Sequence, residues 1–219
     1  MKTHQIFTFI ISIISAYTFN LRMAKESYDS YVFALQWGNC YCRVNNCESQ
    51  LNNIENNIMT IHGLWPSLKS GKLLKSCTQG VEIEEKDTEL FRNLNKYWPS
   101  FRGPATDFWE HEYNKHGYCM VQEKGWDGYE DFFEFVINLY LKDYKYLLKK
   151  AFGEERKLYT LTYQEITNAI QKVMPKAVFK MNCQSGMITE FQFFLEKDFT
   201  PSKNSVFVNN CQSGKIIFK

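Results

Sequence analysis

The sequence predicts an α+β domain in which several helices flank a central, largely antiparallel sheet. Some segments alternate apolar and polar residues with the period of a strand, whereas others repeat apolar residues at helical spacing. The two kinds of segment do not follow the strand–helix–strand rhythm of a parallel sheet, which favours antiparallel pairing. The chain has 219 residues and no internal repeat, so we expect one domain with a substantial core.

Five segments are predicted to be strands. Tyr31–Trp37 places Tyr, Phe, Leu and Trp side chains on alternate positions, which is typical of a half-buried strand. The polar, Asn-rich residues 40–57 that follow predict a loop, and Ile58–His62 predicts a second, short strand. The remaining strands are expected near the C-terminus: Met187–Leu195, Val206–Val208 and Lys215–Phe218.

Apolar residues at helical spacing predict helices over Thr88–Tyr97, Asp107–Lys115, Tyr129–Lys150 and Thr162–Val173. Two of these helices begin with the pattern of a capping box, formed by Asp107 with Glu110 and by Thr162 with Glu165. Gly117 predicts the end of the second helix, because glycine commonly terminates helices.

The first residues have the pattern of an export signal. Lys2 precedes an apolar run, Ile6–Ile14, and the small residues Ser15 and Ala16 follow it. We therefore predict a signal peptide over residues 1–16, cleaved between 16 and 20, and a single domain over residues 17–219; a buried N-terminal helix is the alternative. The run is too short to span a bilayer comfortably, so no stable membrane association is expected.

Seven cysteines fit an exported protein, because disulfides persist in oxidising compartments. The odd number leaves at least one cysteine outside any disulfide within the chain. Cys40, Cys42 and Cys47 are close enough in sequence to suggest structural zinc, but the other cysteines form no second pair. We therefore expect disulfides and no metal.

The net charge of +2 excludes a strong basic field over the whole molecule. A nucleic-acid partner would accordingly be held in a local cleft rather than by overall charge. Aromatic residues make up 16% of the chain, so some rings are available to stack on a ligand.

The chain contains four histidines, and three of them fall in two short segments, Ile61–Pro66 and Phe108–Gly117. In the second segment, His111, Glu112, Lys115 and His116 would span an arc of about 140° on an ideal helix. A solvated helix face with charge pairs four residues apart would explain Glu112 and Lys115, but it does not explain two histidines.

These side chains favour a phosphate ligand over a metal. His111 and His116 are five residues apart and diverge on a helix, and Lys115 would repel a cation. No serine lies in a glycine-rich nucleophile turn, and no cluster of Asp and His indicates a metal-dependent phosphodiesterase. Cleavage of RNA needs a base for the 2′-hydroxyl, an acid for the leaving oxygen and a cation for the phosphorane, which two histidines and a lysine provide.

The two segments resemble the paired active-site motifs of the ribonuclease T2 family of secreted and vacuolar acid ribonucleases. His62-Gly-Leu-Trp-Pro66 resembles the first motif, and Phe108-Trp-x-His-Glu-x-x-Lys-His-Gly-x-Cys119 resembles the second. The resemblance extends from about Tyr31 to Cys211. The chain departs from the family pattern at four positions: Gly38, Ser67, Tyr113 and Asn114.

The resemblance implies a metal-independent endoribonuclease without a cofactor. Such an enzyme would cleave single-stranded RNA through a 2′,3′-cyclic phosphate to 3′-phosphate products. His62 would be the acid and His116 the base, Glu112 and Lys115 would stabilise the transition state, and His111 would bind phosphate. Trp65 would stack on a base, and Ser67, uncharged where relatives often carry an acid, predicts low base specificity.

The resemblance also implies the fold and the setting of the protein. It implies a disulfide-stapled α+β domain with the pairs Cys40–Cys47, Cys77–Cys119 and Cys183–Cys211, although Cys42 is an alternative partner of Cys47. We expect a monomer in the secretory pathway, either secreted or delivered to a vacuole or lysosome. The alternative function is a secreted RNA-binding or signalling protein on the same scaffold that does not rely on cleavage.

Overall fold

The computed structural model describes residues 27–55, 58–74, 77, 80–153, 160–202, 210–211 and 214–217. The predicted signal peptide and the predicted strand Val206–Val208 lie outside these ranges.

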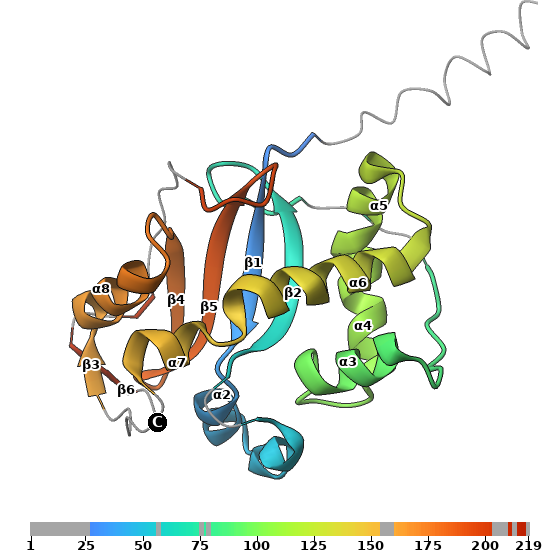
Figure 1. Cartoon of the computed structure of the whole chain (residues 1–219). Coiled ribbons are helices and arrows are strands. Elements are labelled where there is room, and N and C mark those ends of the chain that lie inside the picture. The colour runs from blue at the N-terminus through green and yellow to red at the C-terminus, as the bar shows by residue number, and fades with distance from the viewer. Residues whose placement is uncertain are drawn as a thin grey trace, which may run out of the picture.

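A sheet forms the centre of the molecule (Figure 1). Its strands run in the order β2 (Thr60–Ser67), β1 (Ser30–Gln36), β5 (Met187–Glu196), β6 (Lys215–Ile217) and β3 (Thr160–Thr162), and β4 (Phe179–Gln184) also pairs with β5. Every pair is antiparallel except β5 with β6. The predicted α+β class with a largely antiparallel sheet is therefore confirmed.

Two described strands were not predicted from the sequence. β3 has only three residues, which is too short for a period-two pattern to register. β4 forms a hairpin with β5 through Ser185 and Gly186, whose φ angles of 50° and 76° are the left-handed values that a two-residue hairpin turn requires. In the sequence, the Ser185-Gly186 pair between two strand-forming segments indicates this hairpin.

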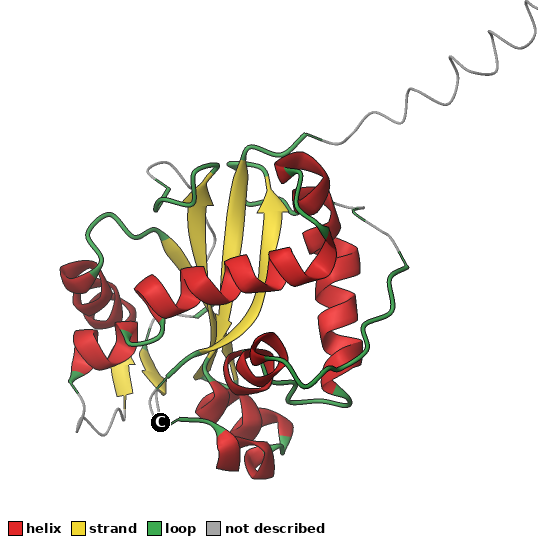
Figure 2. Ribbon diagram, turned by 45° about the vertical axis from the view of Figure 1, so that its right-hand side comes forward, coloured by secondary structure: helices red, strands yellow, loops and turns green. Residues whose placement is uncertain are grey.

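Helices cover one face of the sheet and its β2 edge. α6 (Gly128–Leu139), the π-helical turn η3 (Tyr140–Tyr144) and α7 (Leu147–Phe152) cross the sheet in both views (Figures 1 and 2). α3 (Glu89–Tyr97), α4 (Ala105–Glu112) and α5 (Tyr118–Lys124) lie beside β2, whereas α8 (Tyr163–Val173) lies near β3 and β4.

The two faces of the sheet have different neighbours. Tyr31, Phe33 and Leu35 of β1 belong to the main core, together with residues of α6 and α7. Val32 and Ala34 point the other way and form a small cluster with Trp65 and Phe194. Alternation along the strand thus assigns each β1 residue either to the main core or to the opposite face.

Residues 40–57 do not form the loop that was predicted. They contribute most of α2 (Gly38–Asn45) and the 3₁₀ helix η1 (Glu48–Asn53). α2 is polar on average, but Cys40 and Cys42 are fully buried, so tertiary packing stabilises a helix that composition alone does not indicate.

The helix after Pro104 also differs from the prediction. It begins at Ala105, and Glu110 accepts a hydrogen bond from the Ile83 amide at 2.7 Å instead of closing a capping box with Asp107. Gly117 does not end the helix, since the chain continues through the π-helical turn η2 (Tyr113–Gly117) into α5. The second predicted capping box, at the start of α8, is confirmed.

The disulfides require one correction. Cys42 bonds to Cys47, with the two Cα atoms 4.4 Å apart, so the predicted Cys40–Cys47 pair is wrong. Residues two positions apart in a helix, such as Cys40 and Cys42, are separated by about 200° around the helix axis. Cys40 is therefore turned away from Cys47. The Cys40 thiol instead lies 3.6 Å from the carbonyl oxygen of Ile217. The expected pairs Cys77–Cys119 and Cys183–Cys211 are present.

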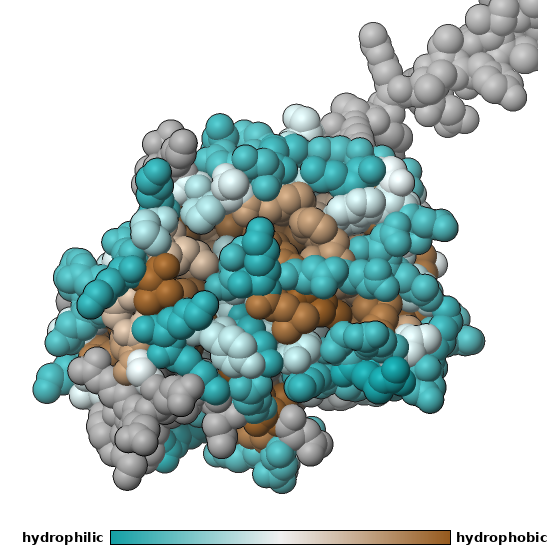
Figure 3. Space-filling view, viewed as in Figure 1, coloured by the Kyte–Doolittle hydropathy of each residue, from teal (hydrophilic) through white to brown (hydrophobic). Residues whose placement is uncertain are grey.

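Polar side chains cover most of the face that α6 crosses, with apolar patches between them (Figure 3). Among the described residues, the large apolar side chains that are strongly exposed are Leu141 and Tyr146. None of the described helices is long and apolar enough to cross a membrane.

Candidate active site

His62 occupies an irregular position of β2. Ala34 pairs with Gly63, and Leu35 pairs with Ile61, which leaves His62 as an extra residue between two registered pairs. A bulge of this kind turns a side chain away from the regular alternation of the strand. The His62 side chain is 27% exposed and lines a cavity of about 500 Å³ together with Phe108 and Arg102.

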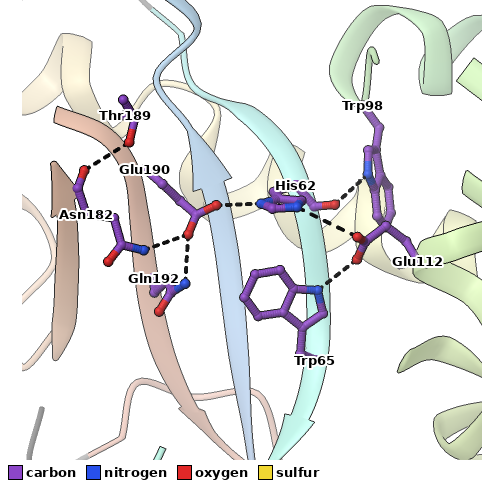
Figure 4. A network of polar contacts seen from close by, with 8 residues as sticks. All are labelled: His62, Trp65, Trp98, Glu112, Asn182, Thr189, Glu190 and Gln192. Carbon is purple, nitrogen blue, oxygen red and sulfur yellow. Dashed lines mark hydrogen bonds and ion pairs between the residues drawn. The ribbon is translucent and has the colours of Figure 1, made fainter. Parts of the chain in front are cut away.

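A buried carboxyl group connects β2 to α4 (Figure 4). Glu112 is 2% exposed, and its Oε2 accepts a hydrogen bond from the Trp65 indole nitrogen at 2.7 Å. Its Oε1 lies 3.7 Å from His62 Nε2. The indole of Trp98 donates to the His62 carbonyl oxygen at 2.8 Å and so fixes the backbone of β2 at this point.

Gly63 is required by the close approach of these groups. A Cβ atom at this position would overlap both Glu112 Oε2 and Trp65 Nε1. Gly63→Ala is therefore expected to separate the indole from the carboxyl group and to lower kcat/KM for RNA by about 10²-fold, as displacements of about 1 Å do in active sites.

This prediction is checked by steady-state kinetics together with the melting temperature. Gly80→Ala is the matched control, because a Cβ atom there meets nothing within 4 Å. Wild-type kinetics for Gly63→Ala would contradict the tight fit of Glu112 against Trp65.

The second motif divides into a buried pair and an exposed pair. Glu112 and His116 are buried and face β2, whereas His111 and Lys115 are exposed. The centroid of the His116 ring lies 5.4 Å from that of Trp65. His116 belongs to η2, where the chain makes a π-helical turn, and such turns are frequent at functional sites.

The surroundings change the pKa values of His62 and His116 in opposite directions. Burial lowers the pKa of His62, but the hydrogen bond and charge of Glu190 and the charge of Glu112 more than compensate, so the pKa is raised. Burial and the nearby positive charges of Lys115, His111 and His62 lower the pKa of His116 to about 3. His62 therefore favours its protonated form and His116 its neutral form.

Two further groups of the site are shifted. Burial, followed by the charges of Lys115 and His62, lowers the pKa of His111. Burial raises the pKa of Glu112 to about 7, against the lowering effects of His62 and the Trp65 hydrogen bond. The described residues contain no group of three or more His, Cys, Asp or Glu side chains placed to hold a metal ion.

Glu190 was not predicted as a site residue. Its Oε2 lies 2.5 Å from His62 Nδ1, and its Oε1 accepts hydrogen bonds from Asn182 at 2.9 Å and Gln192 at 2.7 Å. The sequence contained a signal, because Glu190 and Gln192 interrupt an otherwise apolar strand at alternate positions.

The structure does not support a base-reading role for Ser67. Its side chain is fully buried, and its Oγ lies 3.1 Å from Ser30 Oγ on the neighbouring strand. Ser67 is the last residue of β2, not part of an open turn after Pro66, so it pairs with β1. Trp65 is 7% exposed, and its ring lies beside those of His62 and His116.

Asn114, one of the positions at which the chain departs from the family pattern, pairs with the backbone of Val81. Its amide accepts from the Val81 amide at 2.9 Å and donates to the Val81 carbonyl oxygen at 2.8 Å. A carboxylate cannot donate, so this two-way pairing requires an amide. Asn114 thereby attaches the segment before α3 to the helix that contains the candidate site.

Comparisons with known proteins agree with this geometry. The Ribonuclease T2 family model matches residues 28–211. Ribonuclease DdI of Dictyostelium discoideum is 32% identical over 189 residues, which cover 84% of this chain and 78% of that protein. Ribonuclease T2 of Aspergillus oryzae is 29% identical, but the match spans only 55% of the fungal protein.

A solved structure shows that the fold is shared. The RNase-related protein from Calystegia sepium superimposes with a TM-score of 0.72 at 22% identity, covering 88% of this chain and 97% of that one. The family model matches most of the chain, and both motifs of the sequence meet in one site. The chain therefore belongs to the ribonuclease T2 family of enzymes.

Proposed function

We propose that this protein is an endoribonuclease that cleaves single-stranded RNA by acid–base transesterification, with His116 as the base and His62 as the acid. The observation that carries the proposal is that the rings of these two histidines both lie next to Trp65, 5.0 and 5.4 Å from its ring, and that their pKa values are shifted in opposite directions. Titratable groups whose pKa values are driven apart commonly serve as base and acid in one reaction.

In the first step, neutral His116 accepts the proton of the 2′-hydroxyl, and the 2′-oxygen attacks the adjacent phosphorus. The bond from phosphorus to the 5′-oxygen breaks, and His62 protonates that oxygen from Nε2. The products are a 2′,3′-cyclic phosphate and a free 5′-hydroxyl. In the second step, His62 accepts a proton from water, and the water oxygen attacks the phosphorus. The bond from phosphorus to the 2′-oxygen breaks, His116 returns its proton to that oxygen, and the product is a 3′-phosphate with a free 2′-hydroxyl.

The exposed pair, Lys115 and His111, completes the proposed site. Lys115 stabilises the additional negative charge of the phosphorane, and His111 binds phosphate at the rim. Glu112 lies between His62 and Trp65 and contributes to transition-state stabilisation through its contact with His62 Nε2. All of these groups act on the phosphate without a metal or another cofactor.

The cavity beside His62 is large enough for a nucleoside and is lined by the ring of Phe108 and by several amides and hydroxyls. Two solved relatives carry nucleotides according to their titles, RNase NT with 5′-AMP and an RNase MC1 variant with 5′-UMP. We propose that bases are held mainly by stacking, and hence with low specificity. Phe108 lines the cavity, whereas Trp65, the stacking residue expected from the sequence, is only 7% exposed.

The three disulfides are consistent with folding in the secretory pathway, and we propose that the protein is secreted or delivered to a vacuole or lysosome. We also propose that it acts as a monomer on RNA. The sparse exposure of large apolar side chains among the described residues supports this state.

The function is tested by incubating the purified protein with an RNA oligonucleotide and its DNA counterpart, with and without a chelator. RNA should be cut and DNA left intact, because only RNA has the attacking hydroxyl, and the chelator should change the rate little. Loss of cleavage in chelator that a divalent metal restores would contradict the two-histidine mechanism.

A further inference from the structure

The contact between His62 and Glu190 spans three strands of the sheet. His62 lies on β2 and Glu190 on β5, with β1 between them. Gln36 is the direct partner of Glu190 on β1, and the next residue on the same face is Ala34. The small alanine and the outward turn of His62 at the bulge leave the two side chains free to meet above β1.

Glu190 is itself held in place. Asn182 on β4 and Gln192 on β5 both donate to Oε1, which leaves Oε2 directed at His62 Nδ1. Burial alone would raise the pKa of Glu190, but the hydrogen bonds from His62, Gln192 and Asn182 and the charge of His62 lower it. The group is therefore a carboxylate, which can only accept a hydrogen bond.

We propose that Glu190 is a positioning residue for the acid step. Its carboxylate accepts a hydrogen bond from Nδ1–H of His62 and so orients the ring to present the proton on Nε2 to the leaving oxygen. This inference rests on the proposed function. Glu190 touches no reacting atom and acts only through the imidazole. Its charge also stabilises the imidazolium, because the two groups form an ion pair.

Other charged groups face His62 from the neighbouring helix. Glu112 stabilises the imidazolium, whereas Lys115 opposes it, as do His111 and His116 when protonated. Glu112 approaches Nε2, on the opposite side of the ring from Glu190. At 3.7 Å, Glu112 Oε1 is too far from Nε2 for a hydrogen bond, whereas Glu190 is within hydrogen-bonding distance of Nδ1 and so favours the tautomer of neutral His62 that is protonated on Nδ1.

Glu190→Gln separates charge from orientation. The amide oxygen of glutamine still accepts from Nδ1, but the negative charge is lost. We expect the alkaline limb of the kcat/KM profile to move to lower pH, with a loss of about tenfold at pH 7, well short of the ~10²–10⁴-fold cost of removing an acid–base group. KM should change little, and the loss should diminish as the pH is lowered.

Glu196→Gln is the matched control, because Glu196 lies on the same strand and accepts from Ser202 Oγ at 2.9 Å, away from His62. It should retain the wild-type profile. An unchanged alkaline limb in folded Glu190→Gln would overturn the proposal.

A second measurement, made on the wild-type protein, does not depend on activity. The ¹⁵N shifts of His62, assigned by comparison with His62→Ala, should show the Nδ1-protonated tautomer when the ring is neutral and a pKa above 6.5. The Nε2-protonated tautomer would overturn the role of Glu190. Absence of RNA cleavage together with the Nδ1 tautomer would contradict the proposed function and leave the His62–Glu190 pairing standing.

Discussion

Replacing His116 by Ala is expected to lower kcat/KM for RNA by about 10²–10⁴-fold, because the variant lacks the group that accepts the 2′-hydroxyl proton. His116 suits this role because its lowered pKa keeps it neutral down to a pH of about 3. The loss should appear in kcat, because the proton of the 2′-hydroxyl is transferred only in the chemical step.

His111→Ala provides the comparison for this variant, because it removes a histidine from the same helix but from an exposed position. It should raise KM and leave most of kcat, as expected for a group that binds phosphate. Full activity of a folded His116→Ala protein would refute the assignment of the base.

Replacing His62 by Ala should cost a similar factor on a dinucleoside phosphate, but only a small one on the p-nitrophenyl ester of uridine 3′-phosphate. The nucleoside alkoxide is a poor leaving group that needs a proton, whereas p-nitrophenolate leaves without one. His116→Ala should lose activity on both substrates, because both use the 2′-hydroxyl as nucleophile.

The ratio of the two losses separates the acid from the base within one experiment. Melting temperatures of both variants establish that the comparison is made on folded protein. Equal losses of His62→Ala on the two substrates would contradict an acid role and would favour a structural role for His62 in β2.

The sequence was sufficient to predict which segments meet in the candidate active site. His62 and the segment from Phe108 to Gly117 stood out by composition, and the structure brings them together around Trp65. An ideal helix, however, places His111 and His116 on a single arc. The π-helical turn at Tyr113–Gly117 was invisible in the pattern, and within this region His116 is buried while His111 is exposed.

Contacts between distant parts of the chain were harder to foresee. Glu190 is 128 residues from His62 in sequence, and only the sheet order and the bulge in β2 make the contact possible. Ser67 was predicted to lie at the base-binding site, beyond the end of the short strand Ile58–His62. At the sheet edge, where β2 lies, a proline without an amide hydrogen is tolerated, so the strand continues to Ser67 and buries it.

Local geometry also decided the choice between neighbouring cysteines. Cys40 and Cys42 lie seven and five residues before Cys47, and a loop would permit either pair. The unpredicted helix α2 removes this freedom, because it places Cys42 toward Cys47 and Cys40 toward β6.

The most direct test of the central claim is to identify the first products of RNA cleavage by ³¹P nuclear magnetic resonance in the presence of a chelator. Transesterification by His116 and His62 predicts that a 2′,3′-cyclic phosphate accumulates early and is converted to a 3′-phosphate. Products that carry a 5′-phosphate and a free 3′-hydroxyl from the start would show that water, and not the 2′-hydroxyl, attacks the phosphorus, and would contradict the account.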